Sequence, residues 1–500
     1  MASLVDEISG TSLFALTAFI LTLVYITVSI KSRKTSSPAS SYPPSLGLFK
    51  TLWLLYRSGL PMYELGRQLG YKYGGIYMIN VFGRKVVFLT DFPLIKEAFT
   101  NSSLQARPNL ELDNHGTQQG VILASGERWN QERRFILESF KKFGVGRSKF
   151  EDQIETESKY LIEEIAKLKG EKFDPNHVLV NAVSNVIVSV IFGKRYEYSD
   201  EGFKYFLNLG TRQTKDIIAN LLFLFVPIFP HLPFGKQIHT NMEDAALELH
   251  TFVGGIIKNH KRDLDTEIHR DLIDAYLSEL RLNENGSGGK LSMLNEFNLT
   301  VTIKQMFIAG TDTTALTLRW AMLYMALNPN IQKNVHDEID EAVGRNRLPK
   351  LADKPNLQYT QAVLLELQRM SSISRFGVPH ACTKTTTVRG VTIPEGFIVV
   401  SNLWAVHRDP NLWPEPWKFK PERFLDDNGQ VANRDELIPF STGRRICLGE
   451  SLARMELYIF FTHLMHQFLI EGSNWKDDTV SIVDQGRNPK DYEIHAIHRD

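Results

Sequence analysis

The sequence feature that most restricts the fold is the setting of Cys447, in the stretch PFSTGRRICLGE (439–450). An apolar-periodic run, SLARMELYIFFTHLM, follows directly, and its spacing predicts a helix from about Leu448. The Cys447 sulfur then lies at the N-terminal end of that helix, where unpaired N–H groups and the helix dipole stabilise a thiolate. The chain must therefore fold so that a loop delivers one cysteine to the start of a long apolar helix.

Glycines and arginines on either side of Cys447 indicate what the thiolate can meet. Gly443 and Gly449 remove side chains where the backbone passes close to a flat or bulky group, and Arg445 offers a fixed positive charge to a carboxylate. Together these features are compatible with ligation of a haem iron. A redox thiol and an inert buried cysteine are the alternatives. However, a buried thiol does not need this charged setting, and no resolving cysteine is near in the sequence.

Composition excludes several other classes of protein. The 500 residues contain two cysteines, too few for a disulfide framework or a four-cysteine zinc site, which indicates a reducing compartment. Cys382 has no motif around it and is predicted to be structural. The net formal charge is zero, so nothing indicates binding to nucleic acid. With 43% hydrophobic residues, the chain can bury a large core.

Secondary-structure patterns predict a mainly α-helical body with a small antiparallel β region. Long helical periodicities dominate from about residue 126 to 370. MYELGRQLGYKYG (62–74) is typical of a helix, and two strands that join at Gly83-Arg84 follow it. Short strands and turns return in residues 388–403.

The N-terminus predicts a retained membrane anchor with a basic stop over residues 1–34. LFALTAFILTLVYITVSI (13–30) carries no charge and is about long enough to span a bilayer as one helix. The basic KSRK follows it, so the positive-inside rule places the rest of the chain on the cytosolic side. A Ser/Pro linker (35–45) separates the anchor from a folded domain over residues 46–500. The proline-broken apolar stretch 220–234 either dips into a membrane surface or forms buried core.

Several motifs follow the pattern of a known family in chain order. The positions that match Phe-x-x-Gly-x-Arg-x-Cys-x-Gly are Phe440, Gly443, Arg445, Cys447 and Gly449. This stretch resembles the haem-binding loop of the cytochrome P450 family, the haem-thiolate monooxygenases. Upstream, PEPWKFKPERF resembles the family's Pro-x-x-Phe-x-Pro-x-Arg-Phe segment. The resemblance covers essentially the whole chain, and VPHACTKTT and LGESLARMEL look most like animal microsomal members of the drug- and steroid-metabolising type.

Glu366 and Arg369 stand at i, i+3 in LLELQRM, which places them on one face of a helix. In isolation such a pair is usually a solvated surface ion pair. The resemblance implies instead a buried charge network beneath the haem, in which Arg423 joins them and each buried charge is paired. The implied role of the network is to hold the segment that leads to Cys447.

A polar GTDTT sequence interrupts the apolar helical run of residues 309–327. Glycine and threonine weaken a helix, and threonine hydroxyls can bond carbonyls of the preceding turn. The residues alone therefore fit either an ordinary kink or a local opening for dioxygen and water. The resemblance favours the opening. Matching family positions are Ala309, Gly310, Asp312 and Thr313. The resemblance implies that Thr313 hydrogen-bonds dioxygen at the iron and that Asp312 relays protons.

Trp129 and Arg133 stand at i, i+4 on a helix that is expected to start near Ser125. Both side chains donate hydrogen bonds to carboxylates, although a generic stacking pair would look the same. The resemblance implies that this pair binds a haem propionate. It also places His380 where related members carry a propionate-contacting arginine or histidine, and the alternative is an ordinary strand-end histidine.

The resemblance implies a cytochrome P450 fold with haem b bound through the Cys447 thiolate. It implies a monooxygenase that inserts one atom of O2 into a lipophilic small molecule, by hydroxylation or epoxidation. Electrons are expected from a separate NADPH-dependent flavoprotein reductase, with a cytochrome b-type protein as a second donor. Basic Lys141, Lys142 and Arg444 are candidates for that docking. The expected location is the endoplasmic reticulum membrane. A haem-thiolate isomerase or dehydratase that does not consume O2, and a non-catalytic haem-binding protein, are the alternatives.

Overall fold

A computed structural model describes the chain from residue 42 to 499. Residues within that span that are not described are 82, 110–118, 146–147, 226–232, 266, 285–292, 294 and 473–488. The predicted anchor, most of the linker and the centre of the apolar stretch 220–234 therefore lie outside the described residues. Within the described part of the chain, no helix is long and apolar enough to cross a membrane.

Helices form most of the described structure, as the sequence patterns predict. The helices are α2 (Leu48–Ser58), α3 (Met62–Tyr73), α4 (Phe92–Thr100), α5 (Gly120–Leu123), α6 (Gly126–Phe143), α7 (Ser148–Ala166), α8 (Asn176–Phe192), α9 (Glu201–Phe225), α10 (Pro233–Arg262), α11 (Leu272–Glu284), α12 (Glu296–Leu327), α13 (Pro329–Val343), α14 (Gln358–Ser371), α15 (Leu403–His407) and α16 (Glu450–Gln467). The strands are β1 (Ser45–Gly47), β2 (Ile76–Val81), β3 (Arg84–Leu89), β4 (His380–Ala381), β5 (Thr386–Val388), β6 (Val391–Ile393), β7 (Ile398–Ser401), β8 (Phe468–Gly472) and β9 (Ile494–His498).

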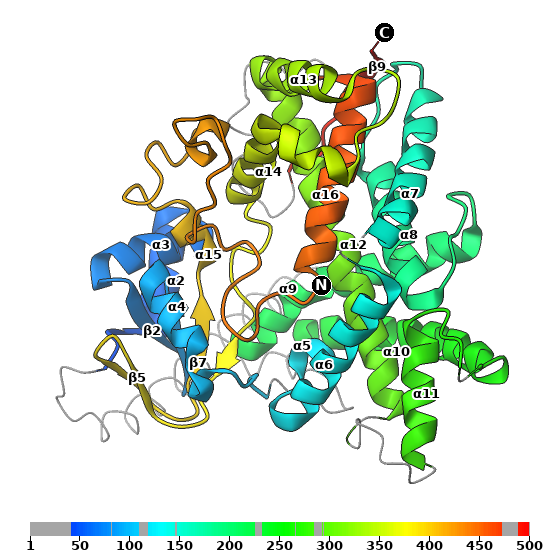
Figure 1. Ribbon diagram of the computed structural model, residues 1–500. Coiled ribbons are helices and arrows are strands. Elements are labelled where there is room, and N and C mark those ends of the chain that lie inside the picture. The colour runs from blue at the N-terminus through cyan, green and yellow to red at the C-terminus, as the bar shows by residue number, and fades with distance from the viewer. Residues whose placement is uncertain are drawn as a thin grey trace, which may run out of the picture.

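The centre of the molecule is formed by α12 and α16, which pack against each other (Figure 1). α12 also packs along α8, and α7 packs on both α8 and α16. The strands β2, β5 and β7 and the helices α2 to α4 lie to one side of α16, and α7 and α8 lie to the other (Figure 1). The helices α8 and α12 are buried on nearly all sides in one continuous apolar cluster. Their sequences are therefore apolar on nearly every face instead of along one stripe.

The main sheet has five strands in the order β1-β2-β3-β7-β4. β2 and β3 pair antiparallel across Gly83, as expected, and β4 and β7 also pair antiparallel. The expected antiparallel region is found only in part, because β1 pairs parallel with β2 and β3 pairs parallel with β7. Parallel pairing of β3 with β7 is possible because the helices α4 to α14 lie between them in sequence and serve as the crossover connection.

Both faces of this sheet are covered, so its strands are apolar at consecutive positions instead of alternating. Val87 and Leu89 point to the face covered by α4, where Ile95 and Phe99 meet them. Val86 and Phe88 point to the opposite face, in the cluster that includes side chains of α2 and α3.

Two helix starts differ in detail from the sequence expectation. α16 begins at Glu450 with Gly449 as its N-cap residue, two positions after the expected Leu448. Ser125 precedes α6, as expected, but its hydroxyl makes no bond to that helix. The hydroxyl oxygen instead accepts a hydrogen bond from the Arg107 N–H at 2.8 Å, so this serine holds the segment before the helix.

Candidate active site

A tight loop delivers Cys447 to the start of α16. The Cys447 N–H donates to the carbonyl of Phe440 at 3.0 Å, and the Ile446 N–H donates to the carbonyl of Gly443 at 3.1 Å. Cys447 keeps an exposed surface, whereas Cys382, the other cysteine, is buried. The side chain that the sequence singled out is therefore the one that another molecule can reach.

The thiol of Cys447 has a raised pKa in the protein alone. Crowding by protein atoms raises the pKa and outweighs the hydrogen bonds from the N–H groups of Gly449 and Glu450 and the charge of Arg133. The N–H groups at the helix start therefore favour the thiolate, as expected, but in the protein alone they do not outweigh burial. A cation bound directly to the sulfur would favour the thiolate, because metal ligation displaces the thiol proton.

The two glycines of the loop have different structural roles. Gly443 has φ +79°, and a Cβ at this position would lie 2.2 Å from the carbonyl oxygen of Phe99 on α4. No other residue fits there, so Gly443 holds the loop against α4. A Cβ on Gly449 would meet nothing within 4 Å. The protein around Gly449 therefore does not require glycine.

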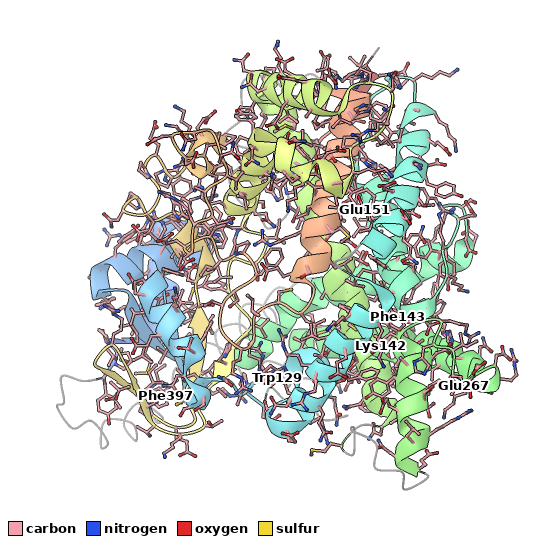
Figure 2. The ribbon with its side chains drawn as sticks, viewed as in Figure 1. Trp129, Lys142, Phe143, Glu151, Glu267 and Phe397 are labelled. Atoms are coloured by element: carbon pink, nitrogen blue, oxygen red, sulfur yellow. The ribbon has the colours of Figure 1, made fainter. Side chains whose placement is uncertain are left out.

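Arginine side chains converge on Trp129 of α6, which lies beside the Cys447 loop (Figure 2). The Arg445 guanidinium carbon lies 3.8 Å from the centroid of the Trp129 ring, and those of Arg133 and Arg444 lie 5.9 Å from it. Arg133 also donates from Nη2 to the carbonyl of Ile446 at 2.8 Å, next to the cysteine. The predicted pair Trp129 and Arg133 is thus brought together with Arg445.

A further arginine, Arg107, belongs to the same group. Burial first, and then the positive charge of Arg133, lowers the pKa of Arg107 to about 9. Burial and the charges of Arg107, Arg133 and Arg444 lower the pKa of Arg445 to about 9 as well. Within the described part of the chain, no carboxylate forms an ion pair with Arg107, Arg133 or Arg445, and Arg445 Nη1 has no hydrogen-bond partner. A buried cationic group of this kind fits an anionic ligand.

The polar stretch of α12 remains helical throughout. The Thr313 hydroxyl donates to the carbonyl of Ala309 at 2.7 Å, and the Thr317 hydroxyl donates to that of Thr313 at 2.8 Å, as back-bonding threonines do. Ala309 is exposed although the helix on either side is largely buried. Gly310 packs so closely on α8 that a Cβ would lie 2.4 Å from Ile187 Cδ1. α12 therefore has one face packed against α8 and an accessible position one turn before Thr313.

Comparison with known proteins decides the family. Residues 42–494 match the family model described as Cytochrome P450. The chain belongs to the cytochrome P450 family. Mouse (Mus musculus) cytochrome P450 2U1 is 39% identical to it over 410 residues, which cover 80% of this chain and 77% of the relative. Human (Homo sapiens) cytochrome P450 2J2 is 39% identical over 407 residues, covering 81% and 80%. Mouse cytochrome P450 2B19 is 35% identical over 444 residues, covering 86% and 88%.

These relatives confirm the resemblance that the sequence motifs indicate. The protein is a cytochrome P450 monooxygenase, and its family carries haem with a cysteine thiolate ligand. The exposed cysteine and the buried arginines without carboxylates fit a flat anionic cofactor of this kind.

The Glu366 network of this P450 is buried, as the resemblance implies. Arg369 Nε lies 2.7 Å from one Glu366 carboxylate oxygen, and Arg423 Nε lies 3.1 Å from the other. The N–H of Lys420 also donates to the Glu366 carboxylate at 2.8 Å, and Arg369 Nη1 donates to the carbonyl of Pro416 at 2.8 Å. The network thus ties α14 to the segment that precedes the cysteine loop.

His380 of β4 is buried and stacks on Phe99 with 4.0 Å between ring centroids. His380 Nδ1 lies 2.6 Å from the carbonyl oxygen of Leu104, so Nδ1 carries the proton. Burial first, and then the charge of Arg107, lowers the pKa of His380 to about 3. A neutral ring leaves Nε2 as an acceptor. Contact with a propionate therefore needs a second proton, which an anion beside the ring would favour.

Sequence motifs missed two residues that shape this site. Arg107 donates to the carbonyl oxygens of Ile122, Val378 and Pro379 at 2.8 to 3.1 Å. Gln305 of α12 accepts from the N–H of Ile122 at 2.8 Å, and it donates to the carbonyl of Gln119 at 3.0 Å. Both side chains form hydrogen bonds with backbone groups of other segments of the chain. Motif spacing in the sequence does not predict contacts of this kind.

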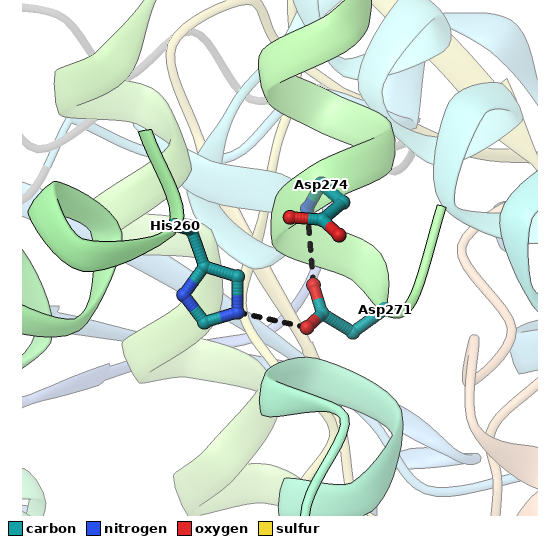
Figure 3. A group of neighbouring side chains, drawn as sticks. All are labelled: His260, Asp271 and Asp274. Carbon is teal, nitrogen blue, oxygen red and sulfur yellow. Dashed lines mark hydrogen bonds and ion pairs between the residues drawn. The ribbon is translucent and has the colours of Figure 1, made fainter. Parts of the chain in front are cut away.

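A separate group of titratable side chains lies where α10 meets α11 (Figure 3). His260 Nε2 is 2.8 Å from Asp271 Oδ2, and the Asp274 N–H donates to Asp271 Oδ1 at 3.0 Å. Arg270 Nε and Nη2 donate to the Asp274 carboxylate at 2.6 and 2.9 Å. Because ion pairs and hydrogen bonds already engage these groups, we interpret them as a structural network and not as a metal site.

Proposed function

We propose that this protein binds haem b through Cys447 and hydroxylates or epoxidises a lipophilic small molecule with O2. The observation that supports this proposal most directly is the pair of features beside one another: an exposed cysteine and a buried arginine group without a carboxylate. A cofactor that offers an iron to sulfur and two carboxylates to arginines satisfies both features.

Trp129, Arg133 and Arg445 are proposed to hold the cofactor's carboxylates, together with Arg107 and a protonated His380. Gly443 sets the path of the loop over α4, and Phe440 anchors the Cys447 N–H through its carbonyl. Gly449 leaves space beside the sulfur, where no protein atom would meet a side chain.

Bound haem supplies the chemistry of oxygen activation, and the protein supplies position and protons. Thr313 and Asp312 are proposed as the groups that hold a hydrogen bond to dioxygen and pass protons toward it. The Thr313 hydroxyl donates to Ala309 in this structure, and rotation about its Cα–Cβ bond frees the proton for another acceptor. The exposed Ala309 and half-buried Phe376 suit an apolar substrate surface.

Electrons are proposed to come from an NADPH-dependent flavoprotein reductase, or from a cytochrome b-type protein. Lys141 and Lys142 are exposed at the end of α6, and Arg444 is exposed in the cysteine loop. Arg444 lies beside Trp129 near the start of α6 and the two lysines lie in its last turn, so an acidic partner is proposed to approach along this helix. Residues 1–34 are proposed to hold the protein in the endoplasmic reticulum membrane with residues 46–500 in the cytosol.

The test uses purified full-length protein and two single variants. Cys447→Ser is expected to abolish the thiolate-type haem absorption band, and Cys382→Ala is the matched control that should keep it. With reductase and NADPH, a lipophilic substrate panel should give oxygenated products and consume O2. Turnover without O2 would support the isomerase or dehydratase alternative, and haem binding without NADPH oxidation would support a non-catalytic protein. An unchanged band in Cys447→Ser would contradict the proposed ligand.

A further inference from the structure

A hollow in the surface lies between α14, α16 and the segment that leads into the cysteine loop. Its volume is about 570 Å³, which is within the range of pockets that hold small molecules. A second hollow of about 480 Å³ adjoins it, and both are lined by Lys354, Gln361, Val431 and Asn433. We call the two hollows together the α14 groove.

One wall of the α14 groove is apolar and fixed in place. Leu364 of α14, Leu457 and Tyr458 of α16, and Ile438 before the cysteine loop line it, and all four are buried. α14 packs on α16, and the Tyr458 hydroxyl donates to the carbonyl of Lys350 at 3.2 Å. This wall can receive an aromatic or aliphatic group, and it needs no rearrangement to do so.

Cations lie beside the apolar wall. Lys354 Nζ lies 5.8 Å from the centroid of the Tyr458 ring, and the Arg454 guanidinium carbon lies 4.9 Å from that of the Phe440 ring. Lys354 keeps an exposed surface, yet the protein atoms around it first, and then the charge of Arg454, lower its pKa. Among the residues that the structure describes, no carboxylate pairs with Lys354. Its positive charge is therefore open to a ligand.

The two acidic side chains that line the groove are already engaged. Glu450 lies 2.9 Å from Arg454 Nε, and Asp435 lies 3.0 Å from Lys96, which is outside the groove. The groove therefore joins an apolar wall to a positive charge that the protein does not neutralise. A molecule with an apolar part and one anionic group satisfies both features.

We propose that the α14 groove binds a small, water-soluble amphiphilic anion, with a carboxylate or sulfonate at Lys354 and an aromatic or aliphatic part on the apolar wall. Ile446 and Phe440 also line the groove, and the Phe440 carbonyl accepts from the Cys447 N–H at 3.0 Å. The ligand therefore contacts the loop that positions Cys447. This inference goes beyond the proposed oxygenation, and it holds whether or not Cys447 binds haem.

The experiment measures binding of 2-naphthalenesulfonate to the purified full-length protein by equilibrium dialysis, with protein-free detergent as the background. Lys354→Met removes the charge but keeps the length of the side chain, and Lys354→Arg keeps the charge. Lys350→Met is the matched control, because Lys350 is close in the chain and does not line the groove. Methanesulfonate, which lacks the apolar part, and uncharged naphthalene-2-sulfonamide are compared on the parent protein.

Lys354→Met is expected to weaken binding about tenfold, because a hydrogen bond to a charged group is lost. Lys354→Arg and Lys350→Met should keep the parent affinity, and both comparison compounds should bind more weakly than the naphthalenesulfonate. Equal affinity of Lys354→Met and the parent would overturn the proposal, as would equal losses in Lys354→Met and Lys350→Met. Absence of saturable binding to the parent would also overturn it, and would favour a segment of a partner protein as the occupant. The haem absorption of the same samples reports separately on the proposed cofactor site.

Discussion

Two groups of arginines are buried in this molecule, and they differ in what neutralises them. Arg369 and Arg423 both contact the Glu366 carboxylate, at 2.7 and 3.1 Å. Arg107 and Arg445 are as deeply buried, but within the described residues they contact backbone carbonyls and no carboxylate. Burial of a charge is unfavourable unless an opposite charge accompanies it.

This difference separates a structural role from a binding role. The Glu366 group is complete, so it needs nothing from outside and serves to fix α14 to the chain before the cysteine loop. Within the described residues the Arg107 and Arg445 group has no carboxylate partner, and we propose that a bound anion supplies the counter-charge. A motif arginine can therefore be assigned a structural or a binding role only when the group that neutralises its charge is known. The predictions below test whether each buried charge behaves as its partners require.

The largest effect is expected from Glu366→Gln, which leaves Arg369 and Arg423 buried without their shared carboxylate. Loss of one member of a buried ion pair typically lowers the free energy of unfolding by about 3–5 kcal/mol. Urea unfolding of the purified chain measures this change. Asp337→Asn removes the exposed i, i+4 ion pair with Lys333 and is the control, for which we expect no measurable loss. A small effect of Glu366→Gln would show that the paired group is not structural.

Arg107→Gln is expected to weaken haem binding while leaving the fold in place. A hydrogen bond to a charged group contributes about 1.5–3 kcal/mol, so the rate of haem release should rise about tenfold to a hundredfold. Haem transfer to an excess of apomyoglobin measures that rate. Removal of one cation relieves repulsion with Arg133 and Arg445, so the free energy of unfolding of the chain should not fall as it does in Glu366→Gln. If Arg107→Gln lowered the free energy of unfolding but left the rate of haem release unchanged, Arg107 would have a structural role and the proposed binding role would be contradicted.

The contrast between the two groups also shows how far the sequence could lead. The sequence predicted four site residues because each stands at a fixed spacing from another residue of the same family motif: Trp129, Arg133, Arg445 and Cys447. The Glu366 and Arg369 pair was recognised in the same way, and its burial is confirmed. Local spacing carries this information because one loop and one helix position these side chains.

Arg107 and the mixed sheet could not be predicted, because both depend on contacts between distant parts of the chain. Arg107 donates to carbonyls more than 270 positions away. Parallel pairing of β3 with β7 likewise joins strands that the helices α4 to α14 separate in sequence. Ser125 shows the same limit at short range, since a competing donor, the Arg107 N–H, takes the hydroxyl that a helix cap would use.

Glu132 on α6 is a buried carboxyl group, so its charge is opposite in sign to that of the buried arginines. The Thr302 hydroxyl donates to its Oε1, and its Oε2 has no hydrogen-bond partner. Burial raises the pKa of Glu132 to about 7, although Thr302 and Arg128 oppose the shift. A carboxyl group whose folded-state pKa is raised contributes stability that is fully present below its unfolded pKa and is lost as pH rises through about 7.

Glu132→Gln should therefore be more stable than the parent at pH 8, by up to about 3 kcal/mol, and no more stable at pH 4.5. Urea unfolding across this range measures the difference, with Glu138→Gln, at an exposed position of the same helix, as the control. A parent chain whose stability does not fall between pH 4.5 and 8 would contradict the raised pKa.

The smallest effect is expected at His260, which is paired but lies near the surface. Its Nδ1 faces the carbonyl of Ile256 at 3.0 Å and its Nε2 faces Asp271 at 2.8 Å, so both nitrogens need a proton (Figure 3). Burial lowers the pKa of His260, but the hydrogen bond and charge of Asp271 outweigh it and the net pKa is raised. The stabilisation is then fully present below the unfolded pKa and is lost as pH rises through the higher folded value.

His260→Gln should lower the free energy of unfolding by about 1 kcal/mol at pH 6, where the imidazolium bonds to Asp271, and by less at pH 8.5. His239→Gln is the control on the same helix, since His239 lies farther from its acidic neighbour, 3.4 Å from Glu243. A loss that grows with pH would mean that neutral His260 is the stabilising form, and the pairing with Asp271 would then require a protonated carboxyl. The effect at His260 is expected to be smaller than at Glu366 because the Asp271 carboxylate left behind keeps the hydrogen bond from the Asp274 N–H, whereas Glu366→Gln removes the one carboxylate that Arg369 and Arg423 share.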